Sequence, residues 1–208
     1  MPEAIRHLLV VAPHPDDEVI GCGGLIARTL EAGGQVTVCV VSDGAGSHPN
    51  SPSYPPHRLR ATRRQESLDA LAVLGVSSAS VHFLDLPDGG SDRWHVPGEL
   101  NALLTLPWDA VALPSQYDNH ADHRATQAMV SARSNTRLLH YLVWPHESGI
   151  RPPEPCLSVD LGPHRRLKAE SLLHYRTQLG MIRDADWNFA IDQPLFQRFT
   201  APVEYFHA

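Results

Sequence analysis

Residues 7–42 read HLLVVAPHPDDEVIGCGGLIARTLEAGGQVTVCVVS, and their pattern decides the fold class. Residues 7–12 and 36–41 are apolar runs bounded by turn residues, which predicts two buried strands. Residues 18–32 lie between these runs and read as a helix that ends at Gly33-Gly34. A strand, a helix and a second strand in succession indicate a β-α-β unit whose two strands run parallel.

The same alternation continues along the rest of the chain. The apolar pattern predicts further strands at 81–84, 110–113, 138–144 and near Leu157, and helices at 58–74, 98–104, 122–132 and 163–179. Nearly continuous apolar strands indicate a mostly parallel sheet that helices cover on both faces. We therefore expect an α/β fold, a Rossmann-like three-layer sandwich with its site at the carboxyl ends of the strands. We expect residues 1–208 to form one domain, with the aromatic-rich segment 180–208 as an extension packed on it.

The composition is that of an ordinary globular protein, with 42% hydrophobic and 19% charged residues. A formal net charge of -6 argues against binding to nucleic acid or to anionic membranes. No apolar run approaches the roughly 18–20 residues that span a bilayer, and no secretory signal is recognised. The three cysteines form no Cys-x-x-Cys pair, which fits reduced thiols in the cytoplasm. A homo-oligomer is compatible with all of these features.

The first polar cluster is PHPDDE, residues 13–18, where the first strand ends and its helix begins. Acidic residues in a first helical turn suit the helix dipole, and Asp is a good N-cap, so helix capping explains the acids alone. It does not explain His14, which the following proline holds in extended geometry. An imidazole held rigidly three residues from a carboxylate is typical of a metal site.

The second polar cluster is DNHADH, residues 118–123, which follows the strand predicted at 110–113. His120 and His123 are three residues apart, so both can lie on one face at the start of the next helix. The alternative is that a residue at position 118 or 119 caps this helix and that the two histidines are incidental. Two clusters at the carboxyl ends of two strands favour a shared metal site.

The residue types indicate the chemistry of such a site. Imidazole nitrogens with one carboxylate suit Zn²⁺, and three protein ligands leave a position for water. The metal would lower the pKa of that water toward about 7. Of the adjacent Asp16 and Asp17, one can bind the metal while the other accepts the proton of the water. We expect about one divalent ion per chain, zinc in the first place, with other divalent metals left open.

These two clusters resemble the motifs of the PIG-L (LmbE-like) zinc-dependent N-deacetylase family. Ala121 stands where the family usually has proline and Thr177 where it usually has serine, and neither change removes a group that the chemistry needs. The resemblance covers about residues 6–180. Its further parts are Ser42-Asp-Gly44, Arg63-x-x-Glu66, Leu74-Gly75-Val76, Phe83-Leu84, Asp88-Gly89 and the late segment with Lys168, His174 and Gln178.

The resemblance implies a hydrolase that removes the N-acetyl group from a 2-acetamido sugar of the N-acetylglucosamine type, or from its conjugate. It implies that His14, Asp17 and His123 bind zinc and that Asp16 is the general base. The small-molecule sugar is then the partner that matters most. Two alternatives remain: a zinc amidase acting on a non-sugar amide, and a non-catalytic protein that binds sugar or metal.

The resemblance gives three further residues a role. His120 would stabilise the oxyanion or protonate the leaving amine, and Asp122 would orient one of the histidines. A helix N-terminus disfavours a charged imidazole, so a cationic His120 needs a nearby carboxylate that the sequence does not identify. Arg63 lies on a basic helix face and is either solvated or in contact with substrate. The loops at 43–57 and 85–97 follow strand ends, so we expect them to flank the metal and to set substrate choice.

Overall fold

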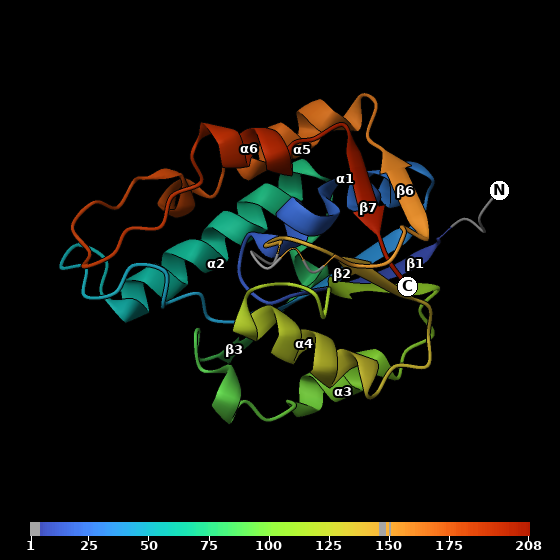
Figure 1. Cartoon of the computed structure of the whole chain (residues 1–208), viewed down its shortest axis with the longest axis horizontal. Helices are drawn as coiled ribbons and strands as arrows, with labels where there is room; N and C mark the ends of the chain where they lie inside the picture. The colour runs from blue at the N-terminus through green and yellow to red at the C-terminus, as the bar shows by residue number, and fades with distance from the viewer. Residues whose placement is uncertain (1–4, 146–148, 150) are drawn as a thin grey trace.

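A five-stranded sheet forms the centre of the protein (Figure 1). This computed structural model describes residues 5–145, 149 and 151–208. The strands follow the order β3-β2-β1-β4-β5, and every neighbouring pair is parallel. The predicted α/β class is therefore confirmed. The strands are β1 (His7–Ala12), β2 (Gln35–Ser42), β3 (Val81–Leu86), β4 (Ala110–Pro114) and β5 (Leu138–Tyr141).

Helices cover both faces of the sheet because its strands are apolar on both sides. Along β1, Leu8 and Val10 are buried in one hydrophobic core, while Leu9 and Val11 are buried in the other. Each such side chain contributes about 1.5–3 kcal/mol by leaving water. The first core lies under α1 (Asp17–Glu31), α2 (Pro56–Val73) and α5 (His164–Leu172), and the second under α3 (Gly98–Leu104) and α4 (Ala121–Ser131) (Figure 1).

The direction of the connections reverses at β1, and this reversal places the site. The chain leaves β1 for β2 on one side, whereas β4 pairs with β1 on the other side. In an open parallel sheet such a switch point leaves a crevice beyond the carboxyl ends of the two strands. The loops after β1 and β4 carry the two polar clusters of the sequence, so the topology brings both clusters to one crevice.

A smaller antiparallel sheet is formed by β6 (Leu157–Asp160) and β7 (Val203–Phe206). The sequence pattern predicted the first of these strands but neither β7 nor α6 (Gln193–Phe199). Phe199 and Phe206 are buried in the same core as Leu8 of the central sheet. Short 3-10 segments complete the chain at η1 (Ser78–Ser80), η2 (Ser91–Arg93) and η3 (Arg176–Leu179).

Two predicted elements are shorter in the structure, and polar side chains explain both. The helix predicted at 163–179 ends at Leu172 and gives way to η3. There the hydroxyl of Tyr175 donates to Glu18 at 2.7 Å, and the backbone N–H of Thr177 donates to Glu66 at 2.8 Å. The strand predicted at 138–144 ends at Tyr141. The next free backbone N–H groups, at 143 and 144, donate to one carboxylate oxygen of Asp118, each at 3.0 Å.

A buried ion pair joins α5 to β7 and α1, and it carries a prediction about stability. The Nζ atom of Lys168 donates to Glu204 at 2.7 Å and to the carbonyl of Ile20 at 2.8 Å. Both charged side chains are almost fully buried. We expect Lys168→Met to lower the free energy of unfolding by about 3–5 kcal/mol, because it leaves the charge of Glu204 buried and unpaired.

Urea unfolding measures this loss, with Lys168→Met/Glu204→Gln as the matched control. The double variant removes both charges, so we expect it to be more stable than the single variant. A loss below about 1 kcal/mol in Lys168→Met would show that the pair adds little to stability.

In the part of the chain that the structure describes, no helix has the length and apolar character to cross a membrane.

Candidate metal centre

The turn between β1 and α1 has an unusual backbone. Asp16, the residue before α1, has a φ of 141°, a backbone conformation that residues other than glycine rarely adopt. Such a conformation costs on the order of 1–3 kcal/mol and persists only where neighbouring groups hold it. The N–H of Asp16 donates to Glu18 at 2.9 Å, and Arg63 donates to the carbonyl of Pro15 at 2.7 Å. Hydrogen bonds therefore hold the peptide unit that precedes this residue.

Three side-chain atoms converge where β1 and β4 end. The Nδ1 atom of His14 lies 3.0 Å from Oδ2 of Asp17 and 3.3 Å from Nε2 of His123. The same oxygen of Asp17 lies 3.1 Å from Nε2 of His123. Tetrahedral zinc with bonds of about 2.0–2.2 Å holds neighbouring donors about 3.3–3.6 Å apart. These three atoms are already within a few tenths of an ångström of that spacing, and their residue types fit zinc.

The electrostatics of this group favour positive charge. Burial lowers the pKa of His14, but the carboxylates around it, led by Asp88, outweigh burial and raise that pKa well above its ordinary value. Burial likewise opposes a charged His123, yet Asp17 and Asp118 raise its pKa to about 9. Burial raises the pKa of Asp17, but His123 and His14 together outweigh it and hold that pKa far below the usual range. A site that draws protons onto two buried imidazoles also stabilises a bound cation.

The far nitrogen of His14 faces two carboxylates. Its Nε2 atom lies 3.2 Å from Oδ1 of Asp88 and 3.3 Å from Oδ2 of Asp122. The backbone N–H of Gly89 donates to that same oxygen of Asp122 at 2.8 Å. With its proton on Nε2, His14 presents the lone pair of Nδ1 to Asp17 and His123. Carboxylates that orient an imidazole in this way are common around metal ligands.

His123 has its own carboxylate partner. Its Nδ1 atom lies 3.1 Å from Oδ2 of Asp118, and this carboxylate is one of the groups that raise the pKa of His123. Both side chains are fully buried. The other oxygen of Asp118 accepts a hydrogen bond from the backbone N–H of His120 at 2.9 Å. This one side chain therefore orders the loop after β4 and faces a candidate ligand.

His120 caps α4 and adopts a definite tautomer. Its Nδ1 atom accepts a hydrogen bond from the backbone N–H of Asp122 at 3.2 Å, so the proton of the neutral ring is on Nε2. Burial, reinforced by His14 and His123, lowers the pKa of His120. Its Nδ1 atom faces a backbone donor and not the carboxylate that a cationic ring would need. Ring nitrogens of His14, His120 and His123 lie within 4.8 Å of one another, a looser set than the one with Asp17.

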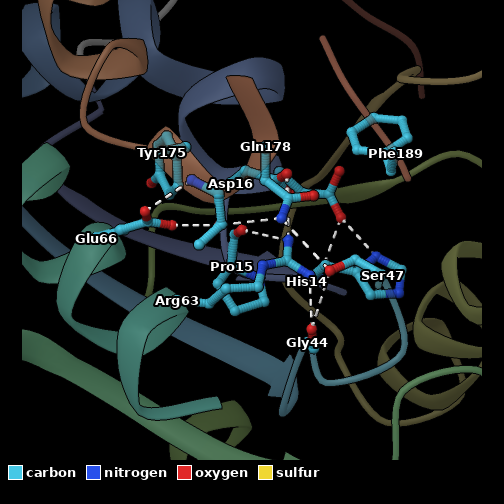
Figure 2. A network of polar contacts seen from close by, with 12 residues as sticks. His14, Pro15, Asp16, Gly44, Ser47, Arg63, Glu66, Tyr175, Gln178 and Phe189 are labelled. Carbon is cyan, nitrogen blue, oxygen red and sulfur yellow. Dashed lines mark hydrogen bonds and ion pairs between the residues drawn. The ribbon is translucent and has the colours of Figure 1, made fainter. Parts of the chain in front are cut away.

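Arg63 contacts Asp16 and donates hydrogen bonds to the loops after β1 and β2. Figure 2 shows its guanidinium directed at Pro15, Asp16 and Gly44. It lies 2.7 Å from the carbonyl oxygen of Pro15, 3.3 Å from Oδ2 of Asp16 and 2.9 Å from the carbonyl oxygen of Gly44. The side chain is buried, so the predicted alternative of a solvated helix face is wrong. Burial raises the pKa of Asp16 to about 8, while Arg63 works in the opposite direction. A contact between Arg63 and substrate stays a prediction.

A cavity of about 640 Å³ opens onto this cluster. Its wall includes His14, Asp16, Asp17 and His120 together with the aromatic residues Trp144, Trp187 and Phe189. Both predicted loops reach it, because Gly46, Ser47, Asp88 and Gly89 are also in its wall. A second cavity of about 500 Å³ shares Ile20, Pro145 and Arg198 with the first, but in the described part of the chain it contains none of the candidate metal ligands.

Two carboxylates of this site have no role that the sequence pattern predicts. Asp118 was considered only as a helix cap, and Asp88 only as part of a motif that resembles the family. Each side chain faces one imidazole of the centre, Asp88 at His14 and Asp118 at His123. The position of Asp118 and Asp88 after strand ends was the one available signal, since the carboxyl ends of parallel strands share an edge.

A doubly wound sheet with histidines and aspartates at its switch point defines a class of α/β proteins with a metal-competent centre. Comparison with known families then assigns the chain more narrowly. The sequence profile of PIG-L, described as GlcNAc-PI de-N-acetylase, matches residues 9–134, which is more than half of the 208 residues. The chain belongs to the PIG-L family, as its motifs predicted.

Curated relatives share a moderate part of the sequence. The diacetylchitobiose deacetylase of Thermococcus kodakarensis is 31% identical over 134 residues, covering 58% of this chain and 46% of that protein. A probable N-acetyl-alpha-D-glucosaminyl L-malate deacetylase 2 of Bacillus anthracis is 28% identical over 164 residues, covering 71% of each chain. The chain spans less than half the length of the first curated relatives that it matches.

Solved structures share the fold over nearly the whole chain. The conserved protein TT1542 from Thermus thermophilus superposes with a TM-score of 0.73 at 24% identity, covering 98% of this chain and 94% of that one. The 4-carboxy-2-hydroxymuconate hydratase GalB of Pseudomonas putida has a TM-score of 0.69 at 18% identity, covering 93% and 82%. Likeness at this level concerns the fold, and function has to be argued from the site.

Proposed function

We propose that this protein is a zinc-dependent N-deacetylase that hydrolyses the acetamide of a 2-acetamido sugar or of its conjugate. The observation that carries the proposal is the closed set of three donor atoms, 3.0–3.3 Å apart, at a cavity whose wall includes the buried carboxylate of Asp16. Membership of the PIG-L family supports the same reaction class. The deacetylases of T. kodakarensis and B. anthracis, whose names specify acetamido-sugar compounds, support the substrate class.

In this proposal His14, Asp17 and His123 hold one metal ion per chain. A zinc ion bound there would supply a water of lowered pKa and would polarise the carbonyl group of the acetamide. The residues of the chain supply the rest. Asp122 and Asp88 keep the proton of His14 on Nε2, and Asp118 holds His123 in place. A fixed tautomer and ring orientation raise the affinity of an imidazole for a metal.

Asp16 is the proposed general base. Its carboxylate lies in the cavity wall, and burial raises its pKa to about 8, so it holds a proton more readily than an exposed aspartate does. A base is most effective when its pKa lies near the working pH. The Asp16 carboxylate accepts the proton of the attacking water. As a carboxylic acid it then returns that proton to the departing sugar amine.

His120 is the proposed hydrogen-bond donor to the carbonyl oxygen of the acetamide. Its Nδ1 atom accepts the N–H of Asp122, which leaves its Nε2–H as donor, and its pKa is lowered by burial. A neutral donor of this kind stabilises the negative charge that develops on the oxygen as the carbonyl carbon becomes tetrahedral. The ring would act without becoming cationic, which agrees with its position at a helix N-terminus.

Acetate release tests the proposed function. Purified protein is depleted of metal with a chelator and then reloaded with about one equivalent of zinc. We expect acetate from N-acetylglucosamine or its glycosides with the reloaded protein and none with the depleted protein. Release from simple non-sugar amides alone would favour the amidase alternative. Tight sugar binding without acetate release would favour the non-catalytic one.

The proposal treats residues 1–208 as one deacetylase domain with 180–208 as its extension. The burial of Phe199 and Phe206 in the core that holds Leu8 supports this organisation. So do the hydrogen bonds between segment 184–189 and the loop after β2, together with the presence of Trp187 and Phe189 in the cavity wall.

A further inference from the structure

Trp187 is an exposed aromatic side chain at the cavity of the candidate centre. Its side chain is 57% exposed, the highest value among the large apolar side chains of the described residues. It nevertheless lines the same cavity as His14 and Asp16. Exposed apolar surface that is continuous with a ligand-sized groove can mark a place where a ligand binds.

Hydrogen bonds hold the segment that carries Trp187 in place both before and after this residue in the chain. Asp184 accepts hydrogen bonds from Ser51 at 2.6 Å and from the backbone of Ser53 at 3.1 Å. Asp186 accepts one from Asn50 at 2.7 Å. The carbonyl oxygen of Phe189 lies 3.1 Å from Nε2 of His48, and Figure 2 shows Phe189 beside the loop that carries Ser47. The exposed ring therefore projects from an anchored segment, as a binding platform must.

Aromatic rings continue from Trp187 into the cavity. Its ring centroid lies 6.1 Å from that of Phe189, which in turn lies 5.9 Å from that of Trp144. Polar side chains line the same cavity, namely Ser47, Asn119 and Gln178. A cavity that holds both aromatic faces and amide and hydroxyl groups suits a sugar ring, whose C–H face packs on a π system while its hydroxyl groups form hydrogen bonds.

The size of the cavity indicates more than one ring. Its volume of about 640 Å³ lies within the roughly 300–1,000 Å³ of pockets that enclose a drug-sized ligand. A single acetamido sugar is a small occupant for such a space. His14 and Asp17 in the cavity wall are buried, whereas Trp187 is exposed, so one ring at the metal leaves the exposed aromatic residue for a second ring.

We infer that Trp187 determines specificity by stacking on a second sugar ring, the one linked to the acetamido sugar that is hydrolysed. The inference rests on the proposed function and adds to it a residue that favours a disaccharide or a longer sugar conjugate over a single acetamido sugar. Trp187 contacts the ring that does not react. It therefore contributes to binding of such substrates and not to the chemical step.

The test compares N-acetylglucosamine with N,N'-diacetylchitobiose as substrates of the zinc-loaded protein. We expect Trp187→Ala to lower the ratio of kcat/KM for the disaccharide to that for the monosaccharide by roughly three- to tenfold. The loss should appear in KM, with kcat unchanged, since the contact is the same in the ground state and the transition state. Trp187→Phe retains an aromatic face and should keep most of the ratio.

Leu173→Ala is the matched control, because Leu173 is 56% exposed and lines neither cavity. We expect it to leave the ratio as in the wild type. An unchanged ratio in Trp187→Ala, with both sugars still hydrolysed, would overturn this inference and leave the proposed function standing. Absence of acetate release from both sugars by the wild type would overturn the proposed function and this inference with it.

Discussion

Replacing Asp16 by Asn is expected to lower kcat by about 10²–10⁴ while the metal stays bound. The variant keeps the size of the side chain but removes the proton acceptor. At 1.36 kcal/mol per decade, the loss corresponds to about 3–5 kcal/mol of transition-state stabilisation. KM should change little, because the missing interaction belongs to the transition state. Steady-state kinetics of acetate release, beside metal analysis of the same sample, measures both quantities.

Asp17→Asn provides the contrast within the same dipeptide. A neutral amide is a poorer metal ligand than a carboxylate, so this variant should lose metal affinity as well as activity. Asp69→Asn makes the same chemical change on an exposed position of α2 and should behave as the wild type. If Asp16→Asn loses the metal while Asp17→Asn retains it, the two proposed roles are reversed.

The second large effect is expected at the imidazoles. His123→Ala and His14→Ala each remove one of the three closely spaced donor atoms. Two remaining ligands hold zinc weakly, so the metal content should fall from about one ion per chain toward none, and acetate release with it. Metal analysis after dialysis gives the stoichiometry, and circular dichroism checks that each variant is folded.

His57→Ala is the control for the loss of a histidine, because His57 is exposed at the start of α2. It should keep the metal content and activity of the wild type. Asp118→Asn tests the carboxylate that faces His123. We expect it to lower metal affinity by about 10–100-fold, the typical effect of removing a carboxylate that orients a ligand. Full metal occupancy in both His14→Ala and His123→Ala would contradict the ligand assignment.

Local sequence signals predicted the parallel sheet, because strand burial on both faces leaves a continuous apolar pattern. Residues 7–42 alone define β1, α1 and β2 within one residue at each end. The two polar clusters could also be assigned to one edge of the sheet, since each directly follows a strand. The family followed from the same residues. All of these features could be predicted from residues that are close together in the sequence.

Element ends were harder to predict where a distant side chain competes for backbone groups. The end of β5 depends on Asp118, and the break between α5 and η3 depends on Glu18 and Glu66. In each case a buried carboxylate accepts hydrogen bonds from a segment far away in the sequence. The hydrophobic periodicity of a segment does not reveal such partners, because it reports only which face of an element is apolar.

The sequence by itself determined the layer architecture and the residue types that meet at the switch point. Only the tertiary structure decided which of their atoms face one another: which oxygen of Asp17 lies between two imidazoles, which carboxylates face His14 and His123, and that Nδ1 of His120 accepts a backbone hydrogen bond. It also decided that Trp187 lies at the cavity. The physical reason is that ligand geometry and proton position depend on differences of a few tenths of an ångström in the distances between side chains far apart in the sequence. Those distances are set when the loops after β1, β2, β3 and β4 pack against one another.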